Sequence, residues 1–153
     1  MKLSTLQNAV AALLRDSEEL VKNNVAVLAE NKGDVFAEIN LALAKLSCCA
    51  LVLTPRFKST ATDSAFPVGY ASVVVQVFEK PLLNRGKASR VTALDAAEII
   101  IAFLHQREVK DTAGRHVTRL VCEELAAENA GDTLAINVHF KTGKIGLAAD
   151  SQT

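Results

Sequence analysis

The stretch VFEKPLLNRGKASRVTALDAAEIIIAFLHQ, from Val77 to Gln106, carries the strongest local signals in the chain. It begins as an apolar strand, continues as a basic loop and ends in an apolar segment that predicts a helix over Ala93–Gln106. Thr92 and Asp95 match a capping box at the start of this helix. Because the helix is apolar around most of its circumference, it must be buried on nearly every side. We expect a sheet to cover about half of it and a neighbouring subunit to cover the rest.

The strand that leads into this stretch, Tyr70–Lys80, is the clearest strand of the sequence. Val73, Val75 and Val77 point to one side of it, and the residues between them, which are also mostly apolar, point to the other. A strand with two apolar faces is typical of a central position that is covered on both sides. It therefore predicts the middle of a sheet.

Hydrophobic periodicity predicts further helices and strands on both sides of this region. The helices are expected at Ser4–Asp16 and Val35–Leu46, and the strands at Val25–Ala29, Cys48–Leu53, Thr133–Gly143 and, on weaker alternation, His116–Leu125. Residues 144–148 (KIGLA) are expected to pair back as a short last strand. Residues 16–24 are expected to form a connection. Residues 56–69 follow Pro55, which ends a strand, and are expected to form an exposed loop or a long hairpin connection.

The order of these elements predicts an α+β fold with a mostly antiparallel sheet and helices packed on one face. At 153 residues the chain fits one domain, 1–153. Lys and Arg together number 17, as do Asp and Glu, so the net charge is zero. This balance argues against a general nucleic-acid binder. No apolar run is long enough to span a membrane, and we expect a cytoplasmic protein.

The ionisable residues show no arrangement typical of a catalytic or metal site. His105, His116 and His139 are not at metal-ligand spacing from one another or from a cysteine. We also find no nucleophile elbow, phosphate-binding loop or dinucleotide fingerprint. Three cysteines without framework spacing favour buried, inert thiols in a reducing compartment. The sequence therefore predicts a protein that is not an enzyme and needs no cofactor or metal.

The loop Asn84–Arg90 places Arg85, Lys87 and Arg90 just before a helix N-terminus, where free amides favour anions. Three interpretations stay open: an exposed charged connection, a contact with a subunit or partner, and a contact with a phosphate or DNA. Its bulky neighbours Leu82, Leu83 and Val91 argue against a phosphate cradle. We name Arg85, Lys87 and Arg90 as candidate subunit or partner contacts.

The phrases CALVLTP, VVVQVFEKPLLNRG, TALDAAEIIIAFLHQ and TLAINVHFKTG, in this order, resemble the small tail-completion or tail-terminator proteins of long-tailed bacteriophages and prophages. The resemblance covers residues 25–143 and lies in the order of elements, with no motif that assigns a functional residue. It implies a structural protein that forms a homo-oligomeric ring, commonly a hexamer. Such a ring caps the tail tube and offers a surface to the head or neck. The protein would assemble in the host cytoplasm, become part of the virion and use no cofactor, and its lumen could touch DNA incidentally.

Two alternatives stay open beside this resemblance. One is a head–tail connector protein of similar size and fold. The other is a small bacterial module that binds a ligand or regulates another protein, which would need a deep apolar pocket with a few converging polar groups.

Overall fold

The computed structural model describes residues 1–30, 34–46, 48–60, 65–81 and 91–147. Four helices are assigned within these ranges: α1 (Leu3–Arg15), α2 (Glu18–Lys22), α3 (Val35–Leu46) and α5 (Ala93–Leu104). The strands assigned there are β1 (Ala26–Ala29), β2 (Cys48–Val52), β3 (Arg56–Ser59), β4 (Val68–Glu79), β5 (Glu108–Lys110), β6 (His116–Ala130), β7 (Thr133–Thr142) and β8 (Ile145–Gly146).

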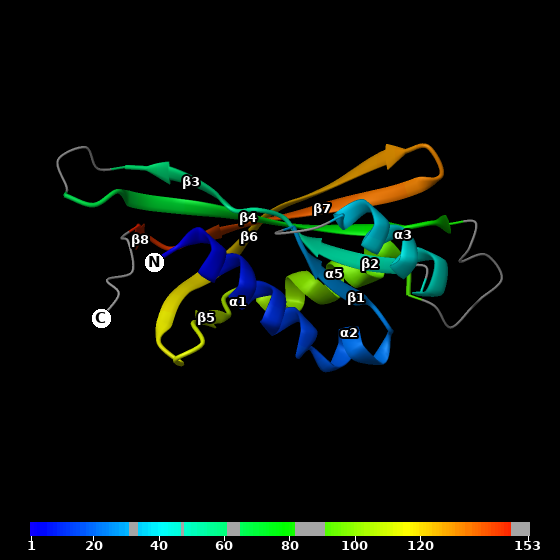
Figure 1. The fold of residues 1–153 in the computed structure, drawn as a ribbon, viewed down its shortest axis with the longest axis horizontal. Helices are drawn as coiled ribbons and strands as arrows, with labels where there is room; N and C mark the ends of the chain where they lie inside the picture. Colours follow the sequence, from blue (N-terminus) through cyan, green and yellow to red (C-terminus); the bar gives the residue numbers. More distant parts are fainter. Residues whose placement is uncertain (31–33, 47, 61–64, 82–90, 148–153) are drawn as a thin grey trace.

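These strands form one eight-stranded sheet whose main path is β1-β2-β4-β7-β6-β5. β3 and β8 pair with the beginning of β4, outside this path (Figure 1). The pairing of β1 with β2 is parallel, and the other pairings between the described strands are antiparallel. The predicted α+β class with a mostly antiparallel sheet is therefore confirmed, and β4 is the central strand that its two apolar faces predict.

The main core lies between one face of the sheet and α1, α2 and α5. Every second residue of β4 points into it, and Val73, Val75 and Val77 are fully buried as the alternation predicts. Phe140 of β7 and Ile100 of α5 are fully buried in the same core. In Figure 1, α1 and α5 lie together below β4 and β7. The helix α5 is held at its start by the predicted capping box of Thr92 and Asp95.

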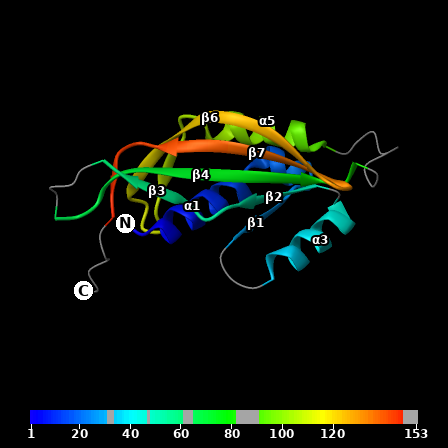
Figure 2. The same ribbon diagram turned by 90° about the horizontal axis from the view of Figure 1, so that it is seen from above.

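A smaller second core lies on the opposite face of the sheet, under α3. Ile39 and Leu43 of α3 pack there against Cys49 and Leu51 of β2. Figure 2 shows α3 and α5 on opposite sides of the strands. The prediction that the helices pack on one face therefore holds for α1, α2 and α5 but is wrong for α3. The reason is that β2 is buried on both faces, so each of its faces needs a cover.

The chain covers one side of α5, as the sequence analysis expects, and the expected cover of its outer side by a neighbouring subunit stays a prediction. Ala96, Ala97 and Ile100 are fully buried against the sheet. On the outer side, Leu94 is 47% exposed, and Ile101 is half-buried. The chain itself thus leaves part of this apolar helix uncovered.

Several elements differ from the sequence-based prediction. The expected connection at residues 16–24 contains α2, which Ser17 caps by accepting a hydrogen bond from the amide of Leu20. The expected loop at residues 56–69 begins with β3, and β5 was not predicted. The strand β6 runs to Ala130, beyond the predicted end at Leu125. None of the described helices is long and apolar enough to cross a bilayer.

Candidate functional site

The candidate contact residues Arg85, Lys87 and Arg90 lie outside the described residues, so their predicted role stays a prediction. The two ends of their loop are fixed by a buried carboxylate. Glu79, the last residue of β4, is 5% exposed, and its Oε1 accepts a hydrogen bond of 3.0 Å from the amide of Ala93. Ala93 begins α5, whose free amides favour a negative charge. The basic loop therefore connects a strand end and a helix start that are held together.

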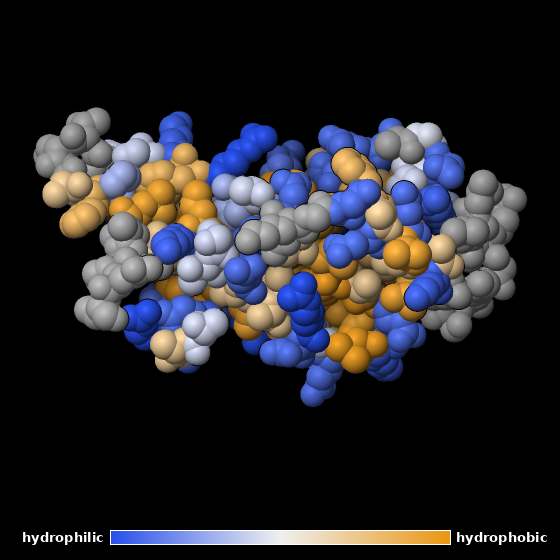
Figure 3. Space-filling model, in the orientation of Figure 1, coloured by the Kyte–Doolittle hydropathy of each residue, from blue (hydrophilic) through white to orange (hydrophobic). Residues whose placement is uncertain are grey.

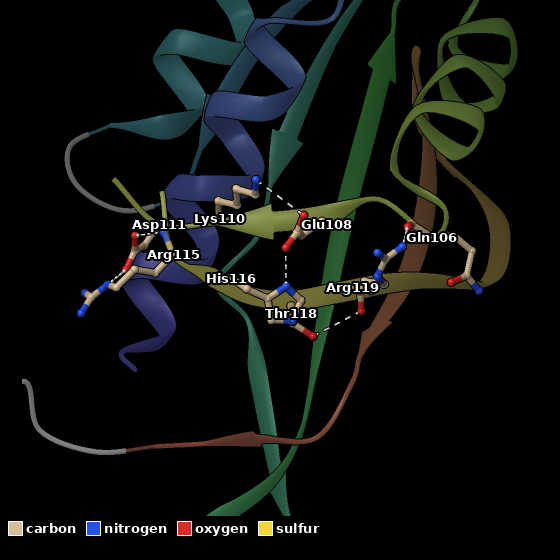
Figure 4. A network of polar contacts seen from close by, with 8 residues as sticks. All are labelled: Gln106, Glu108, Lys110, Asp111, Arg115, His116, Thr118 and Arg119. Atoms are coloured by element: carbon tan, nitrogen blue, oxygen red, sulfur yellow. Dashed lines mark hydrogen bonds and ion pairs between the residues drawn. The ribbon is translucent and has the colours of Figure 1, made fainter. Parts of the chain in front are cut away.

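A polar cluster at the β5–β6 hairpin brings together residues that the sequence analysis did not connect (Figure 4). The Nδ1 of His116 lies 2.8 Å from Oε1 of Glu108, and the Nζ of Lys110 lies 3.7 Å from the other oxygen of the same carboxylate. The hydrogen bond with His116, followed by the charge of Lys110, lowers the pKa of Glu108. All three side chains are at the surface, where such pairs contribute little to stability.

The turn of the same hairpin is built around Asp111. Its Oδ1 accepts 2.9 Å hydrogen bonds from the amides of Ala113 and Arg115, and its Oδ2 lies 2.8 Å from Nε of Arg115. These bonds to Arg115 lower the pKa of Asp111. Gly114 has φ +78°, a left-handed conformation that glycine adopts without steric cost. The contacts of Asp111 thus account for a tight turn and do not need a ligand.

The hairpin borders a shallow hollow of about 590 Å³, whose wall includes Met1, Thr5, Arg115, His116 and Lys144. Asp111 and Thr112 also line this hollow, so its wall is mostly polar. Within the ranges that the structure describes, no three His, Cys, Asp or Glu side chains are grouped as metal ligands. This arrangement forms a polar surface groove.

The other two histidines also lie where a structural role explains them. His105 follows α5, and its Nδ1 accepts a 3.1 Å hydrogen bond from the amide of Cys122. The residue is exposed at this end of the helix. His139 lies on the sheet face opposite the main core, half-buried, as the alternation of its strand predicts.

The three cysteines differ in burial: Cys48 and Cys49 are buried, and Cys122 is half-buried. Cys48 faces the main core and Cys49 the second core, because adjacent residues of a strand point to opposite faces. Burial raises the pKa of both thiols to about 12. Cys122 is half-buried on β6, and burial raises its pKa as well. A neutral thiol is a poor nucleophile and a poor metal ligand.

The sheet face that carries His139 is open next to α3 and forms a second hollow of about 620 Å³. Arg56, Val74, Asn137 and His139 are among the residues that line it. The Oδ1 of Asn137 is buried there without a hydrogen-bond partner among the described residues. At the wall of an open hollow this oxygen can accept a hydrogen bond from water or from a neighbouring protein.

Large apolar side chains are also exposed elsewhere on the molecule. Phe36 and Leu41 of α3 are 80% and 62% exposed. Figure 3 shows orange side chains at the surface over α3 and at the β3–β4 end of the sheet. The exposed fraction of Phe66, at that end, is 57%. Exposed apolar surface of this kind is typical of protein contact sites.

Comparison with known proteins gives a fold but no family. No family model matches the chain, and no curated protein matches it. A solved chain from the "Virion of native gene transfer agent (GTA) particle" superimposes with a TM-score of 0.67. The alignment covers 94% of this chain and 96% of that one, at 18% identity. A second solved protein aligns over 99% of both chains with a TM-score of 0.52 and 14% identity. The chain therefore has the same fold as a component of a virion particle.

Proposed function

We propose that the chain is a structural component of a phage-like virion, and that it acts as a tail-terminator or tail-completion subunit. The observation that carries this proposal is the shared fold, over nearly the whole of both chains, with a chain of a gene transfer agent virion. The order of sequence elements, which resembles tail-terminator proteins, supports the same assignment. In this role the chain forms a ring with further copies of itself at the end of the tail tube, where it meets tube and neck proteins.

The surface of the chain supports a role in assembly. Phe36, Leu41 and Leu94 are exposed apolar side chains on helices, and Asn137 has a buried oxygen without a partner among the described residues. A neighbouring protein that covers such groups removes apolar surface from water and can supply missing hydrogen bonds. We include in the proposal that the chain is not an enzyme and needs no cofactor. The raised thiol pKa values support this part.

The gene that encodes the chain can be deleted in the genome that carries it, and the particles compared by electron microscopy. Loss of a tail terminator is expected to give overlong tails that do not join heads, with normal length restored when the intact chain is supplied. Tails of normal length beside full heads would indicate the alternative, a head–tail connector. Normal particles in the absence of the chain would contradict both roles. Mass spectrometry of purified particles tests whether the chain is part of the virion.

A second experiment concerns the basic loop. Replacing Arg85, Lys87 and Arg90 together by Ala is expected to reduce incorporation into particles if the loop contacts a subunit or partner. Unchanged incorporation with reduced DNA delivery would instead favour a DNA contact. Unchanged incorporation and delivery would indicate an exposed connection.

A further inference from the structure

The edges of β3 and of the second half of β6 have no partner strand among the described residues, as is also true of the outer edges of β1 and β5 at the two ends of the path. β3 pairs with β4 on one side, and no described strand lies on its other side. β6 pairs with β7 along its second half, whereas β5 reaches only the segment His116–Arg119 on its other side. The amides of Leu120 and Cys122 still find acceptors beside α5, so the open edge of β6 begins after Cys122. Open edges present backbone groups that can pair with another strand.

The open edges of β3 and β6 carry opposite charges. β3 contributes Arg56 and Lys58, both exposed, and no acidic residue. The open segment of β6, residues 123–129, contains Glu123, Glu124 and Glu128 and no cation. In Figure 1, β3 and the β6–β7 hairpin extend toward opposite ends of the molecule. Two copies can therefore bring unlike charges together only head to tail.

The charges also lie on one face of the sheet. Arg56 and Lys58 are opposite Ser72 and Tyr70 of β4, on the face that carries Val74. Glu124 is opposite His139, which is opposite Val74. Glu128 is opposite Ala135, which is opposite Phe78, so Glu128 lies on the same face as Glu124. If the sheet continues from one copy into the next, the four side chains become neighbours across the new strand pair.

The direction of the strands permits this continuation. From β3 to β4, to β7 and to β6, each step is antiparallel, so β3 and β6 run in opposite directions. A second copy, displaced across the sheet without being turned over, thus presents its β3 antiparallel to β6 of the first. No reversal of the sheet face is needed.

The register sets the tilt of the strands in such an assembly. Two alternative registers bring a cation opposite a carboxylate. If Arg56 lies opposite Glu128, the second copy is shifted along the strands from the level of Ser72 on β4 to the level of Phe78. If Lys58 lies opposite Glu124, it is shifted from the level of Tyr70 to the level of Val74. These shifts are roughly 20 Å and 13 Å along the strands, against roughly 19 Å across four strand spacings. The strands would tilt by about 35–45° from the ring axis, which is the range of closed barrels.

The shape of the sheet accommodates the same shift. Beside β4, β2 and β1 occupy the level of Val75–Glu79, and β3 occupies the level of Gly69–Ser72. In the shifted copy, β1 and β2 move past the tip of the first copy's β6–β7 hairpin, near Gly131. The β5 strand of the first copy pairs with the beginning of β6, before the open segment. Neither β5 of the first copy nor β1 and β2 of the second therefore occupies the place of the second copy's β3.

We propose that β3 of one copy pairs antiparallel with the open segment of β6, residues 123–129, in the next copy, so that the sheets of neighbouring subunits join into a ring. This interface is the surface through which subunits of the proposed terminator bind one another. The inference rests on the proposed function, because that function requires copies of the chain to assemble. Charged edges also keep isolated sheets from aggregating. Edges of opposite sign prevent like edges from pairing but attract unlike ones, which selects the head-to-tail interface that a ring requires.

Charge reversal tests this interface. The pairs Arg56→Glu with Lys58→Glu, and Glu124→Lys with Glu128→Lys, each place like charges across the junction. Either double variant is expected to weaken self-association about tenfold or more in sedimentation velocity over a concentration series. An equimolar mixture of the two double variants is expected to recover association, because each reversed edge then meets a complementary edge. The fourfold variant is expected to recover it alone.

The matched control is Glu18→Lys with Lys22→Glu on α2, which lie exposed and away from both edges, and should leave association unchanged. Thermal unfolding monitored by circular dichroism checks that each variant folds. Wild-type-like association of both double variants would reject the edge pairing, and so would a loss that neither the mixture nor the fourfold variant restores. A chain that stays monomeric at millimolar concentration would also reject it. Mass spectrometry of particles tests the virion role separately. A result that rejects the edge pairing therefore does not by itself reject the virion role.

Discussion

At the scale of single residues, the buried carboxylate of Glu79 is a polar side chain whose removal should be costly. It accepts a hydrogen bond from the amide of Ala93 at the start of α5, a position that favours negative charge. We expect Glu79→Ala to lower the free energy of unfolding by about 1–3 kcal/mol, because the amide loses its acceptor in a buried place. Urea unfolding measures this change. The control is Glu98→Ala on the exposed side of α5, and an equal effect of both replacements would contradict the proposed role.

The thiols give a second prediction at this scale. Because burial raises the pKa of Cys48 and Cys49 to about 12, little of either is thiolate at neutral pH. We expect a chromogenic disulfide reagent to modify Cys122, which is half-buried, well before the other two. Cys48 and Cys49 should react only at the rate at which the protein unfolds. Rapid modification of all three in the native protein would show that the β2 region opens readily.

The acid side of the stability profile follows from Glu108 and Asp111. Their partners His116 and Arg115 lower both pKa values in the folded state below the ordinary 4.5 and 3.8. Each carboxylate thus stabilises the fold above its unfolded pKa, and the contribution is lost as the pH falls through the folded value. We expect Glu108→Gln to flatten the decline in thermal midpoint below about pH 4.5, with a small effect at neutral pH because the pair is exposed. An unchanged acid profile would show that the contact is not maintained in solution.

Residue roles were predictable from sequence where they depend on alternation and not where they depend on tertiary contacts. Adjacent residues in a strand face opposite sides, so the two buried environments of Cys48 and Cys49 followed from the strand prediction. Glu79 meets Ala93, and His105 meets Cys122, across loops and between elements. No local pattern records such contacts. The candidate residues Arg85, Lys87 and Arg90 lie outside the described ranges and stay a prediction.

At the scale of elements, the β3–β4 hairpin depends on Gly69. A Cβ at this position would fall inside the contact distance of the Lys58 carbonyl oxygen and close to the Cα of Ser59. We expect Gly69→Ala to push β3 away from β4 and to lower the free energy of unfolding by about 1–3 kcal/mol. Hydrogen exchange should show reduced protection within β3, Arg56–Ser59. The same variant should weaken self-association if β3 is an assembly edge.

Gly146→Ala is the matched control, because Gly146 belongs to β8, which pairs with the same end of β4, and a Cβ there meets no atom within 4 Å. We expect it to leave both protection and stability nearly unchanged. Equal loss of protection in the two variants would mean that this end of the sheet is sensitive to any added side chain.

Apolar elements with a clear pattern were predicted, and elements that are short and polar or irregular were not. The strands β3 (RFKS) and β5 (EVK) are short and mostly polar, so no apolar pattern distinguishes them from a loop. The alternation of β6 is broken by a shift in register between Cys122 and Glu124, which reverses the face of the residues that follow. This bulge explains why the sequence favoured a strand only weakly and ended it too early.

At the scale of the whole molecule, the two cores share one strand. Cys48, Ala50 and Val52 of β2 belong to the main core, and Cys49 and Leu51 belong to the second core under α3. The main core in turn includes Leu6 near the beginning of the chain and Ile145 near the end of its described part. The sequence predicts one domain from length and element order, but it does not show which face α3 covers, since both faces of β2 are apolar.

This shared strand predicts that residues 1–153 unfold as a single cooperative unit. Leu43 is the buried anchor of α3 at 1% exposed, and we expect Leu43→Ala to lower the free energy of unfolding by about 2–5 kcal/mol. The urea midpoints from circular dichroism, which follows the helices, and from the fluorescence of Tyr70, the only tyrosine, should fall together. A midpoint that falls for circular dichroism alone would mean that α3 unfolds as a separate unit. In that case β2 would remain folded with one face exposed to water, which its five buried residues make unfavourable.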